Sequence, residues 1–243
     1  MKKVFIAVIA VVLLSVLVLS ACGPTKSGNE PESAVPSQNI ETTEAGPQEV
    51  NMNKAMSTTF QINGQQISLP CELRDISNAL GEGYDCLQPT EPVDSKQVEY
   101  CKFTKSDSYY SITAILVNVA DKPASHWDCD VVGIKLERYD NFSNKMKDEE
   151  RAACPDIKII GISPADNIDV DKIAPSLCDK DEIPNIFDET RNYNNDTFTE
   201  RHFYTTFETA FSNDCSLAIS TIKETGDVFC VEVNCSSGYV IES

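Results

Sequence analysis

Apolar and polar residues alternate along much of the chain from residue 58 to residue 243, which predicts short β-strands. The alternation follows from strand geometry, because successive side chains on a strand point to opposite faces of the sheet. The expected strands cover residues 98–103, 109–119, 130–138, 157–162, 202–211, 215–223 and 228–235.

A β-hairpin is predicted around Asn63 and Gly64, a residue pair that favours a two-residue type I′ turn. In this register the facing pairs are Phe60 with Ile67 and Thr58 with Leu69, which places the apolar side chains on one face.

Two short helical segments interrupt the strand pattern. One follows Pro70, and the other lies between Asp169 and Phe187. The first has an apolar stripe at helical spacing and a glycine as its natural stop: Leu73, Ile76, Leu80 and Gly81.

The last three strands can be placed in register from the two turns that join them. We expect three-residue turns at 212–214 and 224–226, with Gly226 in the left-handed conformation. A slip of one residue in either turn would move a row of apolar side chains to solvent. The expected facing pairs are Thr209 with Leu217, Phe207 with Ile219, Ile219 with Val231, and Leu217 with Val233.

These elements predict an α+β fold made mostly of antiparallel β-meanders with short helices. The order of strand, helix and three strands recurs in residues 58–140 and 155–243, which suggests an internal duplication. This arrangement resembles the fold of the β-lactamase inhibitor proteins and related small envelope lipoproteins. The resemblance implies architecture alone, since we match no functional residue of those families to this chain.

The N-terminus has the features of an export signal. Lys2 and Lys3 precede an apolar run over residues 4–19. The following sequence, Leu19-Ser20-Ala21-Cys22, resembles the lipobox of bacterial lipoproteins. The resemblance implies that residues 1–21 are cleaved and that Cys22 carries a lipid. An uncleaved membrane-spanning helix is the alternative, but it needs about 20 apolar residues, and this run is short for that.

Residues 22–57 are predicted to form a disordered tether behind the lipid, because the stretch from 23 to 57 has no aromatic residue and is rich in polar residues and proline. Acyl chains such as palmitate on Cys22 would hold the protein on the extracytoplasmic face of the cell membrane. The formal charge is −18, and removal of Lys2 and Lys3 with the signal makes it −20. This charge argues against nucleic acid as a partner.

Ten cysteines are present, so nine remain if Cys22 is lipidated. The strand register places Cys215 opposite Cys235, within the distance that a disulfide spans. We expect a bridge there, or at least proximity; two small apolar residues packed on one sheet face are the alternative. Pairing of the other seven cannot be read from their spacing: Cys71, Cys86, Cys101, Cys129, Cys154, Cys178 and Cys230.

No residue pattern in the chain predicts catalysis, a cofactor or a metal. The chain has two histidines and no spaced cysteine motif, which argues against zinc. The acidic run with Asp166, Asp169 and Asp171 lacks the glycine and glutamate of a calcium-binding EF-hand, so we interpret it as a solvated loop and leave calcium open.

The leading hypothesis is therefore a non-enzymatic binding module outside the membrane, with a protein or a small ligand as partner. A cysteine-dependent hydrolase that uses Cys129 or another free thiol with His126 or His202 is one alternative. A structural protein of the envelope or spore is another, suggested by the number of cysteines.

Overall fold

The computed structural model describes residues 58–87, 92–106, 108–138, 146–178, 183–193 and 196–239. The expected signal peptide, Cys22 and tether lie outside this part of the chain. The strands are β1 (Thr59–Ile62), β2 (Gln65–Ser68), β3 (Cys71–Glu72), β4 (Tyr84–Leu87), β5 (Val98–Lys105), β6 (Tyr110–Val117), β7 (Asp130–Arg138), β8 (Ile157–Ile159), β9 (Asn185–Tyr193), β10 (Asp196–Phe207), β11 (Cys215–Ile222) and β12 (Val228–Asn234). The helices are α2 (Leu73–Leu80), α3 (Asp148–Ala152), α4 (Val170–Leu177) and the 3₁₀ turn η2 (His126–Asp128).

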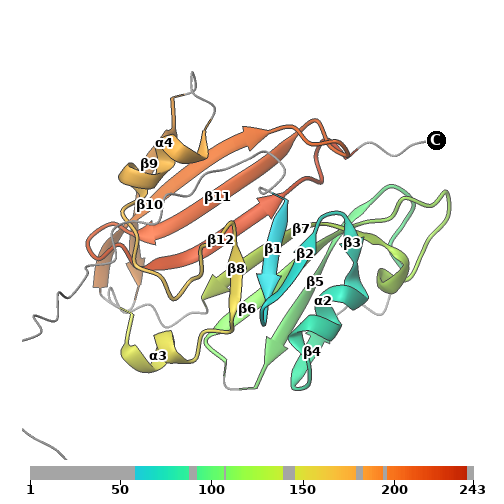
Figure 1. The fold of residues 1–243 in the computed structure, drawn as a ribbon, viewed down its shortest axis with the longest axis horizontal. Helices are drawn as coiled ribbons and strands as arrows, with labels where there is room; N and C mark the ends of the chain where they lie inside the picture. Colours follow the sequence, from blue (N-terminus) through green and yellow to red (C-terminus); the bar gives the residue numbers. More distant parts are fainter. Residues whose placement is uncertain are drawn as a thin grey trace, which may run out of the picture. The chain divides into compact units, whose positions relative to one another are not determined.

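The fold is mostly antiparallel β-sheet with a few short helices, as expected. A large sheet has the strand order β4-β5-β6-β7-β12-β11-β10-β9, and β3 pairs with β7 off this path. A small sheet has the order β2-β1-β8 and lies in front of the large one in Figure 1. Each meander strand pairs with its neighbour in the chain, and β7 pairs with β12 at the centre.

The predicted hairpin and first helix are confirmed. Phe60 pairs with Ile67, and both Asn63 and Gly64 have the positive φ angles of a type I′ turn. The helix α2 ends at Leu80, and Gly81 follows it with a φ of 75°. The apolar stripe of α2 is buried, so the helix covers the large sheet beside the hairpin.

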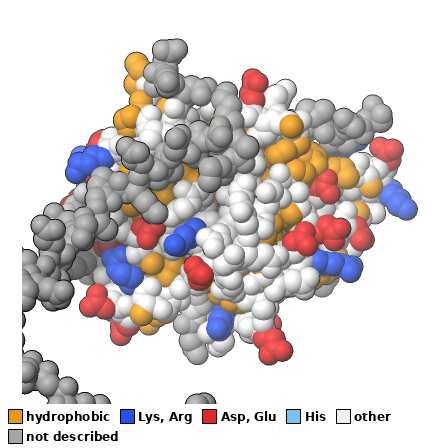
Figure 2. All heavy atoms as spheres, in the orientation of Figure 1, with side chains coloured by type: hydrophobic (Ala, Val, Ile, Leu, Met, Phe, Trp, Pro, Cys, Tyr) orange, Lys and Arg blue, Asp and Glu red, His pale blue; other side chains and the backbone are white. Residues whose placement is uncertain are grey.

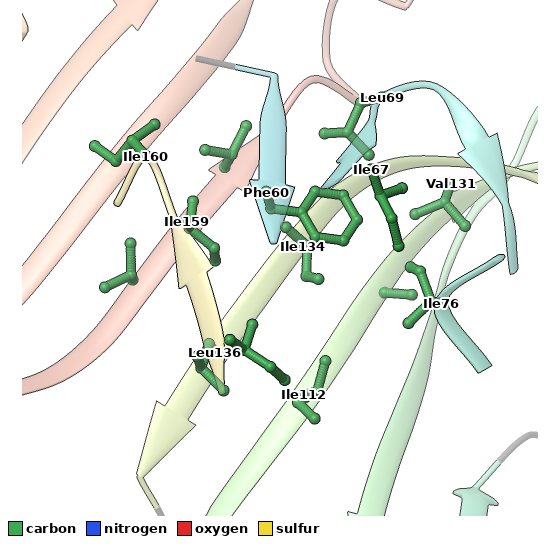
Figure 3. Close-up of a cluster of buried hydrophobic side chains, with 14 of the residues drawn as sticks. Phe60, Ile67, Leu69, Ile76, Ile112, Val131, Ile134, Leu136, Ile159 and Ile160 are labelled. Atoms are coloured by element: carbon green, nitrogen blue, oxygen red, sulfur yellow. The ribbon is translucent and has the colours of Figure 1, made fainter. Parts of the chain in front are cut away.

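The core lies between the small and the large sheet. Figure 3 shows Phe60 and Ile159 of the small sheet pointing toward Ile134 and Leu136 of β7. All four side chains are at most 2% exposed. Burial of such side chains contributes about 1.5–3 kcal/mol each, so this layer is the main source of stability.

The predicted register of β11 with β12 is confirmed. Ile219 pairs with Val231 and Leu217 with Val233. Gly226 has a φ of 73°, and a Cβ atom added there would lie 2.8 Å from the carbonyl oxygen of Ile168. The turn therefore requires glycine both for its backbone conformation and for space.

The predicted register of β10 with β11 is wrong by four residues. Phe207 pairs with Cys215 and Phe203 with Ile219, whereas we expected Phe207 opposite Ile219. The strand β10 ends at Phe207, and a seven-residue connection over 208–214 replaces the three-residue turn expected at 212–214. A shift of four residues keeps every side chain on its face, so alternation alone does not detect it.

Three strands were missed, β3, β4 and β9, and each meander has four strands where three were expected. The strand β4 precedes β5, and β9 precedes β10. The helical segment expected between Asp169 and Phe187 is present only in part, as α4 over Val170–Leu177. β9 begins at Asn185 and forms one edge of the large sheet.

Candidate functional site

Four charged or titratable side chains gather where β9 pairs with β10. We call Glu189, Arg191, Glu200 and His202 the β9–β10 cluster. Glu200 and His202 are two residues apart on β10, and Glu189 lies directly opposite Glu200 on β9. Phe203, next to His202, belongs to the core. Because neighbouring residues of a strand face opposite ways, the β9–β10 cluster lies on the face of the large sheet turned away from the small sheet, which we call the outer face.

Arg191 links the two carboxylates of the cluster. Its Nε lies 3.2 Å from Glu200 Oε2, and a terminal nitrogen lies 3.0 Å from Glu189 Oε2. The side chain of Glu200 is 9% exposed, whereas that of Arg191 is 51% exposed. A buried carboxylate is thus held by a cation that reaches it from solvent.

The ring of His202 is held in place from three sides. Its Nδ1 lies 2.9 Å from Ser220 Oγ, Phe187 stacks on it with ring centroids 5.0 Å apart, and Phe229 meets it edge-on. Its Nε2 lies 3.2 Å from Glu200 Oε2. Nε2 is nevertheless buried and makes no well-directed hydrogen bond to any described group.

These residues include three that could hold a metal. Within the described ranges, the only group of three potential metal ligands with mutual distances within 4.8 Å is Glu189, Glu200 and His202. None of these ligands was predicted from the sequence, because β9 was not expected as a strand. A Glu-x-Arg sequence on one strand and a Glu-x-His sequence on the next were the available signal.

The acidic loop at Asp166, Asp169 and Asp171 does not form a common site, because each carboxylate has its own partner. Asp166 accepts the Ser163 N–H, Asp169 caps α4, and Asp171 pairs with Arg201 at 2.6 Å.

Burial favours the protonated form of three thiols outside the disulfides, those of Cys71, Cys129 and Cys230. Burial raises the pKa of Cys71 to about 12, that of Cys129 to about 11 and that of Cys230 to about 12. Cys129 Sγ donates to the Ser125 carbonyl, and His202 faces Ser220. Because the thiolate is the reactive form, the raised pKa of Cys129 gives no support to the alternative of a hydrolase that uses Cys129 with His126 or His202.

The predicted proximity of Cys215 and Cys235 is confirmed. The two residues form a disulfide with Cα atoms 4.0 Å apart. A second disulfide joins Cys86 on β4 to Cys101 on β5, with Cα atoms 6.6 Å apart. This pairing was not predicted, because β4 was not expected as a strand.

A hollow of about 490 Å³ lies beside the start of α2. Its lining is polar and acidic and includes the protonated thiol of Cys71. Figure 2 shows the face that carries the small sheet, where acidic and basic side chains are interspersed on the described surface. Among the described residues, neither feature contains three potential metal ligands as close together as those of the β9–β10 cluster. The residues lining the hollow are Gln65, Gln66, Ile67, Ser68, Pro70, Cys71, Glu72, Asp75 and Asp130.

A buried ionic network joins the β11–β12 turn to the segment around α3. The carboxylate of Asp227 accepts the Met146 N–H at 3.0 Å and pairs with Arg151 at 2.9 Å. Asn167 and Thr225 donate to it as well. Burial alone would raise the pKa of Asp227, but these hydrogen bonds together lower it below its ordinary value. Arg151 and Asn167 also donate to backbone carbonyls, those of Ala165 and Thr225, so the network links several segments of the fold.

Comparison with protein-family models finds no match, and comparisons with characterised proteins and with solved structures find no significant relative. The described residues include no helix that is long and apolar enough to cross a bilayer.

Proposed function

We propose that this protein is a lipid-anchored binding module on the extracytoplasmic face of the cell membrane, with the β9–β10 cluster as its binding surface. The basic, apolar and small-residue segments that lead to Cys22 support the anchor. One observation carries the binding role. Two carboxylates, a guanidinium and an imidazole converge at one place on the outer face of the sheet, and ligand sites are built from convergent polar groups of this kind.

We also propose that the α+β architecture arose from two similar units. One runs as β1, α2 and the meander β4 to β7, and the other as β8, α4 and the meander β9 to β12. The pairing of β1 with β8 and of β7 with β12 supports this proposal, because each strand pairs with its counterpart in the other unit.

The anchor is tested by removing the lipidated thiol. We expect Cys22→Ser to move the protein from the membrane fraction to the soluble fraction, because stable attachment requires acyl chains that this variant cannot receive. Metabolic labelling with palmitate, followed by fractionation, measures both effects. Cys71→Ser is the matched control and should keep label and location. Retention of Cys22→Ser in the membrane would contradict the anchor.

The binding surface is tested by photo-crosslinking in intact cells. A photoreactive residue at Tyr204, which is 39% exposed on the same side of β10 as His202, should form a discrete adduct with a protein partner. The same residue at Gln66, on the small sheet, is the control. The adduct at 204 should fall at least several-fold in a Glu200→Gln background, because that change removes a charge from the cluster. Equal adducts at both positions, or no effect of Glu200→Gln, would contradict this surface as a site for protein partners.

A further inference from the structure

We propose that Glu189, Glu200 and His202 form a Zn²⁺ site on the outer face of the large sheet. This inference deepens the proposed function, since it rests on the β9–β10 cluster as the binding surface and names the ligand class that the cluster takes. It does not depend on the lipid anchor.

The distances among the three ligands suit a tetrahedral ion. Atoms bound at 2.0–2.1 Å to a tetrahedral centre lie about 3.4 Å from one another. His202 Nε2 lies 3.2 Å from Glu200 Oε2 and 3.8 Å from Glu189 Oε2. A small movement of the exposed Glu189 side chain would therefore complete three corners of the tetrahedron. The fourth corner remains for water or for a donor atom of a partner.

The imidazole is oriented as a metal ligand before any ion binds. Metal-bound histidines usually donate their second ring N–H to an oxygen, which fixes the tautomer and the ring position. Ser220 Oγ stands 2.9 Å from Nδ1 and can accept that hydrogen bond. In that tautomer Nε2 carries its lone pair and points toward Glu200, so a cation bound between the two atoms would be held by both.

Arg191 supplies the positive charge of the cluster when no metal is present. It contacts both carboxylates, yet its side chain is half exposed. Exposed ion pairs contribute little to stability, so the guanidinium can swing into solvent when a divalent ion takes its place. The two carboxylates balance the charge of the ion, and Arg191 is released as a free cation beside it. Metal affinity should therefore rise when Arg191 is removed, a result that a purely structural cluster would not give.

The ligand set also selects the type of ion. A neutral imidazole suits zinc and other transition metals, whereas calcium takes six to eight oxygen ligands. One nitrogen and two carboxylates should favour Zn²⁺ over Ca²⁺ at equal concentration.

The test is titration of the purified full-length protein in mild detergent with Zn²⁺, followed by calorimetry, and with Co²⁺, followed by visible absorption. We expect one Zn²⁺ per chain and the absorption of tetrahedral Co²⁺. Glu200→Gln and His202→Asn should each weaken Zn²⁺ binding by more than about 100-fold, and Ser220→Ala by about 10-fold. Arg191→Met should strengthen binding, and excess Ca²⁺ should not displace Zn²⁺.

Glu232→Gln, on β12, is the matched control and should bind Zn²⁺ as the wild type does. Thermal unfolding without metal shows whether each variant is folded. Every variant keeps all the cysteines, so Zn²⁺ held by thiols would bind wild type and Glu200→Gln equally, and that result would overturn the proposal. So would the absence of binding, or weaker binding in Arg191→Met. If Zn²⁺ fails to bind while the Tyr204 adduct persists, the metal site is wrong and the binding surface stands. If Zn²⁺ binds but no adduct forms at Tyr204, the cluster binds the metal and the surface is not a site for a protein partner.

Discussion

Replacing Asp227 with asparagine is expected to lower the free energy of unfolding at neutral pH by about 3 kcal/mol. The side chain is 3% exposed and accepts hydrogen bonds from a backbone N–H and three side chains. An asparagine has one acceptor oxygen and two N–H donors, so it cannot accept the same set. It would also leave Arg151 without its negative partner in a part-buried site. Urea unfolding at pH 7 measures the loss.

The effect of Asp227→Asn should depend on pH. Because the pKa of Asp227 is lower in the folded protein than in the unfolded chain, its contribution is full above the unfolded value of about 3.9 and is lost as the pH falls through the folded value. The stability difference between wild type and variant should therefore shrink below pH 4. Asp94→Asn, at an exposed position, is the control and should change stability little. A difference that stays constant down to pH 2 would contradict the role of the ionised carboxylate.

Removing the disulfide between Cys215 and Cys235 should cost about 3 kcal/mol. The bridge joins residues 20 apart in sequence, and in the chain-entropy model a loop of that length stabilises the folded state by roughly this amount. For a domain of this size, the loss corresponds to a fall in melting temperature of about 6–12 °C. The double variant Cys215→Ala with Cys235→Ala, followed by circular dichroism on heating, measures it.

The control for the disulfide is Cys230→Ala, which removes a buried thiol on the neighbouring strand without breaking a bridge. It should cost less than the double variant. In a variant that lacks the Cys86–Cys101 bridge, chemical reduction should lower the melting temperature by about as much as the double variant does. Equal melting temperatures for wild type and the double variant would show that the bridge does not stabilise the fold.

The part of the fold that the sequence predicts is the part in which a turn residue and an apolar pattern agree. Gly226 marks the β11–β12 turn and sets the register, and alternation from Leu217 to Val233 agrees with it, so the pairing and the proximity of Cys215 to Cys235 follow. No such residue marks the connection from β10 to β11. Phe203 and Phe207 lie four residues apart and therefore point to the same face of the sheet, so alternation alone allows either to face Ile219. Packing against the rest of the core selects Phe203.

The candidate site could not be predicted because it depends on an edge strand without an apolar pattern. Most side chains of β9 from Asp188 to Asn192 are charged or polar and exposed on both faces. Their strand conformation comes from pairing with β10, a tertiary effect that propensity does not contain. Without β9, Glu189 has no place beside Glu200, and His202 was assigned to the start of a strand when it lies within β10.

The central pairing of β7 with β12 has a consequence for how the chain reaches its final state. About a hundred residues separate β7 from β12, and a similar number separates β1 from β8. The two meanders therefore cannot pair with each other until both have been synthesised. If the chain is exported with its N-terminus first, the backbone hydrogen-bonding groups of β7 that face β12 stay unpaired until β12 has left the translocation channel. Contacts of such long range slow folding, and an open edge invites pairing with other chains. An exported chain of this topology would therefore need its open strand edge protected until the last strand arrives.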